Sequence, residues 1–323
     1  MQNDENPLTI IGDWGNANFH AIAGWIAANL RFRIQGPGAP GSQYVIKTGS
    51  GYRDNIDAVA SGAADVAITT PADIALEMAV AGRDFFAGTP YPHLRTLGYI
   101  PQDDRLVLAV RADTGIESFA DIREKRPALS LATGSRGEHN LMTWAVMEAL
   151  RSHGIDPADI EGWGGRWMEH DHPRRALEWA ISGEANAVFF EGILVPQWWS
   201  FVEKVPVRFI PMEEEALGDL SSRLGLRPGT LERGRLGAET DVPCLDWSNW
   251  GIVVRDDMPD EMAHMITAVM VEERAELEGR YRHLPYERSP LSYPIDPYTM
   301  HKGLGAPLHP GAERYYRDNG YLS

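Results

Sequence analysis

The amino-acid sequence predicts an α/β protein built from two lobes with a ligand cleft between them. Its 323 residues, 43% of them hydrophobic and 9% aromatic, are enough for two domains of about 100 to 200 residues each. Short apolar runs alternate with stretches of helical periodicity, as in βαβ units with mainly parallel sheets. The segment SGAADVAI at Ser61–Ile68 is echoed by SGEANAVF at Ser182–Phe189. Each reads as a helix that ends at Gly before a buried strand, which favours two comparable lobes.

The first lobe opens with a doubly wound pattern of alternating strands and helices. Strands are expected at Leu8–Ile11, Tyr44–Lys47 and Val66–Thr69, and helices at His20–Leu30 and Tyr52–Ser61.

Two extended segments are predicted to carry the chain between the lobes. Arg105–Arg111 (RLVLAVR) and Asn249–Arg255 (NWGIVVR) are apolar runs followed closely by acidic and turn-forming residues. Because only these crossovers join the lobes, we expect them to act as a hinge. Lobe one would then comprise residues 1–111 and 248–323, and lobe two residues 112–247.

The C-terminal part begins with a helix, indicated by apolar residues between Met262 and Met270. Residues 281–310, rich in Pro, Tyr and His, are expected to pack as an irregular strap over lobe one.

The charge and the cysteine content exclude several classes of protein. The formal net charge of −16 would repel nucleic acid and anionic membranes, so neither is expected as a partner. The single cysteine, Cys244, has no second cysteine with which to form a disulfide within the chain. We expect it to be a buried bystander, because nothing near it in the sequence marks a base that would activate a thiolate.

The beginning of the sequence lacks a basic region followed by an apolar stretch, and its first Lys or Arg is Arg31. No run of about 18 apolar residues occurs that would span a membrane. Two locations are therefore expected: the periplasm, if an export signal was removed from this chain, or the cytoplasm.

Four loops that follow predicted strands are the candidate ligand-binding elements, because open α/β sheets bind ligands beyond the carboxyl ends of their strands. They are GDWGNANFH at residues 12–20, TGSGY at 48–52, TTPAD at 69–73 and TGSRGEHN at 133–140. The second and fourth loops share Thr-Gly-Ser and lead into helices, so they can present N–H groups and a hydroxyl to a carboxylate. The alternative is that Ser and Thr only cap those helices.

Individual side chains in these loops suit the recognition of a small organic carboxylate, with aromatic acids among the candidates. Arg136 can grip two carboxylate oxygens, although a surface ion pair is the alternative. Glu191 could bind a ligand amine or hydroxyl, or else a cation of the protein. Aromatic residues such as Trp14 and Trp247 could form apolar walls, or pack in the core. The predicted ligand contacts are Asp13, Trp14, Asn18, His20, Thr48, Ser50, Tyr52, Thr70, Ser135, Arg136, His139, Glu191 and Trp247.

Signatures of enzymes and metal sites are incomplete. TGSRG resembles a nucleophile elbow, but Thr133 stands where the first Gly belongs. The adjacent acids and histidines of EHDH, residues 169–172, fit neither a zinc helix motif nor a calcium loop, and we expect a solvated turn there. TGSG lacks the spacing and the Lys of a phosphate-binding loop. No catalytic residue, metal or cofactor is therefore assigned.

Over nearly its whole length the sequence resembles the TAXI family of solute-binding proteins of TRAP transporters. The matching pieces are LTIIGDWGNANFH, KTGSGYRDNIDAVASGAADVAIT, LRTLGYI, DRLVLAVRADTGIESFADI, TGSRGEHN, SGEANAVFFEG and PLHPGAERYYRDNGYL, the last being the most specific. The resemblance implies a type II periplasmic-binding-protein fold that closes on a small organic ligand, commonly a carboxylate. It also implies delivery of the ligand to TRAP membrane subunits. The first loop departs from the family, in which it is richer in small residues.

Two functions from different classes follow from these observations. The favoured one is a non-catalytic, monomeric binding protein for a small carboxylate. The alternative is a cytoplasmic enzyme on the same fold, such as an aromatic-acid decarboxylase with His20 or His139 as acid or base beside Glu191.

Overall fold

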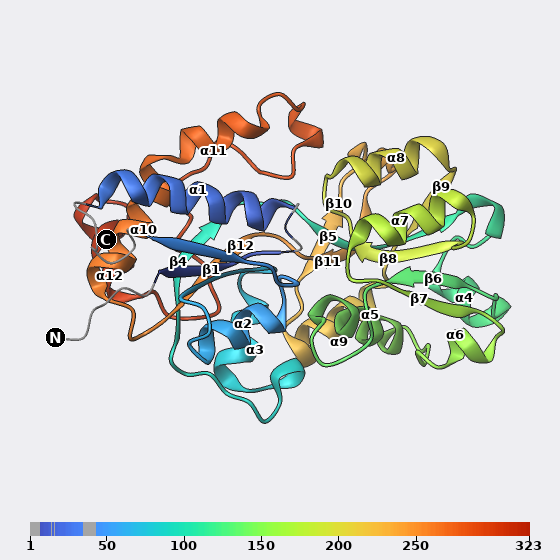
Figure 1. The fold of residues 1–323 in the computed structure, drawn as a ribbon. Helices are drawn as coiled ribbons and strands as arrows, with labels where there is room; N and C mark the ends of the chain where they lie inside the picture. Colours follow the sequence, from blue (N-terminus) through green and yellow to red (C-terminus); the bar gives the residue numbers. More distant parts are fainter. Residues whose placement is uncertain (1–6, 14, 16, 35–42) are drawn as a thin grey trace. The chain divides into compact units, whose positions relative to one another are not determined.

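The computed structural model describes residues 7–13, 15, 17–34 and 43–323, and it confirms the mixed α/β class. The chain divides into two units, each with a sheet of its own (Figure 1). Unit 1 comprises the described residues up to Gln102, Ser248–Tyr286 and Leu291–Ser323, and unit 2 comprises Asp103–Trp247 and Glu287–Pro290. Residues 103–111, expected in lobe one, lie in unit 2 because their strand pairs with three strands of that unit.

The sheet of unit 1 has the strand order β2-β1-β3-β12-β4. Its strands are β1 (Leu8–Ile11), β2 (Tyr44–Lys47), β3 (Val66–Thr69), β4 (Leu94–Ile100) and β12 (Trp250–Arg255). β1 pairs in parallel with β2 and β3, so the carboxyl ends of these three strands share one edge. β12 runs antiparallel between β3 and β4. The predicted strands at 8–11, 44–47 and 66–69 are confirmed.

Helices cover both faces of this sheet. In the view of Figure 1, α1 lies above the strands, and α2 and α3 lie below them. The helices of unit 1 are α1 (Asn18–Arg33), α2 (Arg53–Ala60), α3 (Ile74–Ala81), α10 (Asp260–Glu272), α11 (Arg274–Tyr281) and α12 (Pro310–Asp318), with a 3₁₀ turn at Asp84–Phe86. α3 ends at Gly82, whose φ of 63° is the left-handed conformation that glycine adopts without steric cost.

The sheet of unit 2 has the strand order β10-β11-β5-β8-β6-β7, and β9 also pairs with β5. Its strands are β5 (Arg105–Arg111), β6 (Ser130–Thr133), β7 (Arg166–Glu169), β8 (Ala187–Glu191), β9 (Val207–Ile210), β10 (Pro228–Leu231) and β11 (Val242–Asp246). β6 runs parallel to β7 and β8, whereas β5 is antiparallel to β8, β9 and β11. The apolar run of β8 is buried along its whole length, as expected of a central strand.

Helices flank this second sheet, and their ends follow local sequence signals. They are α4 (Phe119–Lys125), α5 (Leu141–Ser152), α6 (Asp159–Gly162), α7 (Pro173–Ser182), α8 (Pro196–Lys204) and α9 (Glu214–Leu224), with 3₁₀ turns at Ala112–Thr114 and Arg235–Gly237. The Asn140 side chain accepts the N–H of Thr143 at 2.9 Å and so caps α5.

The connections between the units are shorter than the predicted crossovers. β5 and β12 are strands inside the two sheets, and the chain passes between units at Gln102–Asp103 and at Trp247–Ser248. It also does so at either end of the short segment Glu287–Pro290, which belongs to unit 2. The predicted strap packs largely on unit 1, where the Met300 carbonyl accepts the N–H of Tyr99 at 2.9 Å. Within it, a 3₁₀ turn spans Tyr286–Arg288. No described helix is long and apolar enough to cross a membrane.

Candidate functional site

The loops after β1 and β2 are tied to the end of β3 by one buried side chain, Asn55 of α2. Its Nδ2 donates to the carbonyls of Gly12 and Ile68, each at 2.8 Å, and its Oδ1 accepts the N–H of Gly51 at 3.3 Å. Asn55 is fully buried. These bonds use most of the capacity of the amide, so Asn55 fixes the geometry of the three loops.

The first loop is organised by a carboxylate of the protein itself. Asp13 is buried, and its Oδ2 accepts the N–H of Phe19 at 2.8 Å at the start of α1. Its Oδ1 accepts the N–H of Gly15 at 3.2 Å. A negative charge is stabilised at a helix N-terminus, so Asp13 takes the place in which a ligand anion would bind. The predicted contact Trp14 lies outside the described residues.

The other predicted residues of α1 have different environments. The Asn18 Oδ1 accepts the hydroxyl of Tyr281 at 2.9 Å, and burial raises the pKa of Tyr281 to about 12, so this phenol remains a donor. His20 is half-buried, with its ring against Gly12. Its buried Nδ1 forms no hydrogen bond within the described part of the chain.

The second loop repeats the use of an internal carboxylate. The Ser50 hydroxyl and backbone N–H both donate to the carboxylate of Asp54, the latter at 2.7 Å. Thr48 is exposed, whereas Tyr52 and Thr70 are buried. The Thr-Gly-Ser donors of this loop are thus committed in part to Asp54.

The fourth loop, residues 133–140 in unit 2, is held by two acidic residues of the EHDH segment. The Asp171 Oδ1 accepts the N–H of Ser135 at 2.9 Å and the amide of Asn140 at 2.8 Å. The Glu169 Oε2 accepts the N–H of Arg136 at 2.7 Å. EHDH is therefore more than a solvated turn, because two of its carboxylates order the neighbouring loop.

The side chain of Arg136 already makes contacts within the protein. Its Nε donates to the Glu169 Oε1 at 2.7 Å, and its guanidinium lies over the Trp167 ring at 4.9 Å. A second acid, Glu161, lies 3.7 Å from the guanidinium. His139 in the same loop is exposed.

The start of α5 retains donors that the protein does not use. The N–H groups of residues 137–142 form no hydrogen bond within the described part of the chain. The hydroxyls of Thr133 and Thr143, both fully buried below this loop, also have no partner among the described residues. A helix N-terminus with free N–H groups attracts an anion.

Glu191 and Trp247 form a second polar cluster in unit 2. The Trp247 indole donates to the Glu191 Oε1 at 2.9 Å, and the Trp198 indole donates to the Glu191 carbonyl at 2.6 Å. Asp104 is fully buried nearby, and burial, followed by the negative charge of Glu191, raises its pKa well above the usual value. Two carboxylates in one buried place disfavour double ionisation, so the cluster holds a proton more readily than a free acid does.

The described predicted contacts of unit 1 thus lie in the loops after β1, β2 and β3 or, for Asn18 and His20, in the first turn of α1. In unit 2, Ser135, Arg136 and His139 lie in the loop after β6, Glu191 is the last residue of β8, and Trp247 follows β11. Sequence reasoning missed Asn55 and Asp171, which hold those loops in place. Asn55 lies in the first turns of a predicted helix, where Asn has a low intrinsic preference, and that was the only local signal. Asp171 carried no signal beyond its acidic neighbours.

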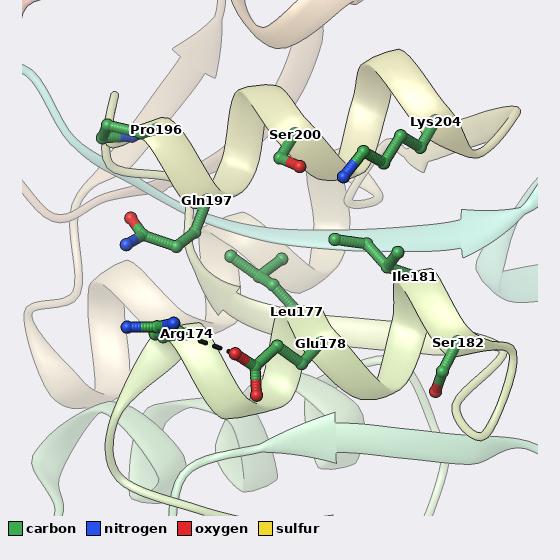
Figure 2. A pocket seen from close by; sticks show the side chains of 9 residues that line it. All are labelled: Arg174, Leu177, Glu178, Ile181, Ser182, Pro196, Gln197, Ser200 and Lys204. Carbon is green, nitrogen blue, oxygen red and sulfur yellow. Dashed lines mark hydrogen bonds and ion pairs between the residues drawn. The ribbon is translucent and has the colours of Figure 1, made fainter.

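Two surface cavities of unit 2 lie apart from these loops. A groove of about 550 Å³ runs between α7 and α8, and Figure 2 shows Leu177 and Ile181 pointing between the two helices. Arg174 and Glu178 form an ion pair on one rim, and Lys204 lies on the other. No predicted contact residue lines this groove. A second cavity of about 540 Å³ borders β9.

Metal and thiol chemistry find no support in the described residues. They contain no group of three or more His, Cys, Asp or Glu side chains arranged to hold a metal ion. Cys244 is buried, and burial raises the pKa of its thiol to about 12, so it is protonated at neutral pH.

Comparison with known proteins identifies the fold. A model of the NMT1-like family matches residues 37–320. A TctC solute binding protein from Polaromonas has a TM-score of 0.55 at 11% sequence identity, with 99% of this chain and 99% of that chain covered. MatC from Rhodopseudomonas palustris, with bound malate, has a TM-score of 0.52 at 13% identity, covering 88% of this chain and 92% of that chain. The predicted fold, that of two-lobed periplasmic binding proteins, is confirmed.

Proposed function

Because the chain belongs to the NMT1-like family, we propose that it is a periplasmic solute-binding protein that captures a small organic carboxylate. We further propose that it acts as a monomer and delivers this ligand to the membrane subunits of a TRAP-type transporter, as a TAXI-type binding protein. The fold supports solute binding in general. The class of ligand is argued from the loops.

The proposal of a carboxylate ligand rests mainly on the free N–H groups of residues 137–142. They lie in the loop that leads into α5, a helix of 12 residues, and in the first two residues of that helix, whose dipole favours a negative charge. At the first two loops the equivalent donors are already satisfied by Asp13 and Asp54. The loop before α5 therefore keeps free N–H groups, whereas in the second loop the N–H groups of residues 49–52 are all bonded within the protein. Free N–H groups of this kind are the donors that an external anion needs.

The predicted contacts supply the remaining groups of the proposed site. Thr48 and His139 are exposed, whereas the Nδ1 of His20, which has no partner among the described residues, is buried near Gly12. Arg136 is held by Glu169, so a ligand carboxylate that recruits this guanidinium has to compete with that ion pair.

The proposal is tested by a thermal-shift screen followed by calorimetry. The screen contains mono- and dicarboxylates, malate among them, together with aromatic acids, amino acids and the methyl ester of each acid. A ligand that binds only the folded state, present at a free concentration of 100 times its Kd, stabilises the protein by about 2.7 kcal/mol. A carboxylate that binds should therefore raise the melting temperature, and its methyl ester should not. Equal shifts with acids and esters, or no shift with any acid at millimolar concentration, would refute the carboxylate.

Variants of the Arg136 ion pair test the contact residues. If Arg136 binds the carboxylate, Arg136→Ala weakens binding by about 1.5 to 3 kcal/mol, the usual range for a hydrogen bond to a charged group. Glu169→Gln strengthens binding, because it removes the competing carboxylate. Arg174→Ala, at the ion pair with Glu178 on α7, is the matched control and leaves affinity unchanged. Wild-type affinity in a folded Arg136→Ala variant would remove Arg136 from the site.

A further inference from the structure

Strand β9 has one edge that no other strand covers among the described residues. β9 pairs antiparallel with β5, with Val207 opposite Arg111 and Phe209 opposite Ala109. The N–H of Ala112 donates to the carbonyl of Pro206 at 2.9 Å, which fixes the alternation of this ladder. In an antiparallel pair, alternate residues direct their N–H and C=O groups to the partner strand. Arg208 and Ile210 therefore bond to β5, whereas Val207 and Phe209 direct theirs to the opposite side.

These outward backbone groups border the cavity of about 540 Å³. It is lined by Val207 and Phe209 of β9 and by residues of the 236–242 segment, among them Leu236, Glu239 and Val242. In the described part of the chain, the N–H and C=O groups of Val207 and Phe209 form no hydrogen bond. Val207 is half-buried and Phe209 is buried, so these unpaired edge groups are reached through the cavity. Unpaired edge groups are a template for one more strand.

We propose that this groove, between β9 and residues 236–242, binds an extended basic peptide segment of a partner protein as an additional strand beside β9. Main-chain bonds to Val207 and Phe209 would hold the segment, and alternate side chains would enter the cavity, as in other cases of strand addition.

The charges around the groove select a basic segment. Of the charged residues that line the cavity, Glu117 and Arg208 form an ion pair with each other. Glu239, which also lines it, is exposed and forms no ion pair with a described residue, and Asp241, two residues further along the chain, is exposed as well. The groove therefore carries excess negative charge within a chain of net charge −16. A second copy of the chain, equally acidic, is repelled from it.

The flanking prolines limit what can bind. Pro211, the next residue whose backbone faces outward, has no N–H group, and the N–H of Val205 is bonded to the carbonyl of Phe201 at 2.9 Å, so the edge offers donors at Val207 and Phe209. A short edge bounded by prolines is protected from unspecific sheet extension. A segment that does bind must therefore be held in one register, with its side chains matched to the cavity.

The first test is amide hydrogen exchange of the free protein measured by NMR. The N–H groups of Val207 and Phe209 should exchange at least about tenfold faster than those of Arg208 and Ile210, because only the latter are hydrogen-bonded in the sheet. Equal protection of all four would mean that this edge is already covered, and the proposal would be wrong.

The second test uses a capped seven-residue peptide in which valine alternates with lysine. Its titration should shift the resonances of Val207 and Phe209 and of residues 236–242. The same peptide with N-methyl groups on the residues that face β9 loses main-chain donors, so its affinity should be lower by a factor of about ten or more. A peptide with glutamate in place of lysine should not bind. Equal affinity of the methylated or the acidic peptide, or no binding at millimolar concentration, contradicts strand addition by a basic segment.

A protein variant completes the test. Val207→Pro removes a donor that faces the groove and leaves the β5–β9 ladder intact, so it should lower peptide affinity about tenfold without changing the melting temperature. Glu239→Lys should weaken binding of the lysine peptide and allow the glutamate peptide to bind. If Val207→Pro does not fold, the comparison of methylated and unmethylated peptides on the wild-type protein still tests whether main-chain bonds hold the peptide. A dimer in sedimentation that Val207→Pro abolishes would make a second copy the occupant and overturn the proposal.

Discussion

The role of Asn55 predicts a large and pH-dependent loss of stability in Asn55→Asp. The carboxylate matches the amide in shape, but it cannot donate to the carbonyls of Gly12 and Ile68 that Asn55 now satisfies, each at 2.8 Å. A buried acceptor left without a donor costs about 1 to 3 kcal/mol. Two such carbonyls give an expected loss of about 2 to 6 kcal/mol in the free energy of unfolding at pH 7.

The pH dependence follows from the proton that the new carboxyl would need. Burial against two carbonyls favours the protonated acid, so the pKa of the introduced carboxyl rises above its unfolded value of about 3.9. The folded variant then holds a proton that the unfolded chain releases, and its stability falls as pH rises from about 4 toward the folded pKa. At low pH the protonated carboxyl introduced at position 55 has an O–H group, which can donate to one of the two carbonyls. The deficit relative to wild type should be smaller at about pH 4.5 than at about pH 8.

The assay is urea unfolding at both pH values, with hydrogen exchange by mass spectrometry to locate the loss in unit 1. Asn319→Asp is the matched control, because the exposed Asn319 amide donates to a single helix carbonyl, at 2.9 Å. It should cost less than about 1 kcal/mol. An Asn55→Asp protein within about 0.5 kcal/mol of wild type at pH 7, or an equal deficit at both pH values, would refute this account of the loops.

Two further predictions concern titratable groups of unit 2. The Nε2 of His153 accepts the N–H of Glu213 at 3.0 Å, and the pKa of His153 is lowered, chiefly by burial, so the folded protein resists a proton that the unfolded chain accepts. The stabilising contribution of neutral His153 is therefore complete above about pH 6.5 and is lost as pH falls. His153→Gln should make the melting temperature fall less steeply between about pH 6.5 and 5. An unchanged dependence of the melting temperature on pH would contradict this role of His153. A binding protein should return candidate acids unchanged to mass spectrometry, whereas a product that disappears in Glu191→Gln would establish an enzyme.

The fold was predictable because its determinants are local and repeated. Leu8–Ile11 and Val66–Thr69 are apolar runs bounded by turns, and such runs form buried strands whichever residues lie beyond them. The strand at Arg105–Arg111 was also predicted with its observed bounds, yet its assignment to a sheet was not. An apolar run shows that a strand is buried on both faces, but the neighbours that bury it are set by pairing across long distances in the sequence.

The candidate site was less predictable, because its contacts join residues that are distant in sequence. The Thr-Gly-Ser loops indicated anion-binding donors, but nothing at Ser135 shows that Asp171 lies 2.9 Å from its N–H group. Asn55 reads as an ordinary polar residue on a helix, since the three loops that it joins belong to three different strands. Spacing rules operate within one element, whereas these bonds depend on how the strands are ordered in the sheet.

The internal carboxylates also bear on what the proposed site could select. Asp13, Asp54 and Asp171 each satisfy loop donors that a ligand anion would otherwise occupy. An internal acid is already ordered by the fold, so it binds such donors without the entropy cost that a free ligand pays. A free carboxylate can therefore compete where N–H groups have no internal acid, as at residues 137–142. Acids of the protein would thus restrict the ligand charge to one place, and selectivity among carboxylates would come from the rest of the ligand rather than from its charged group.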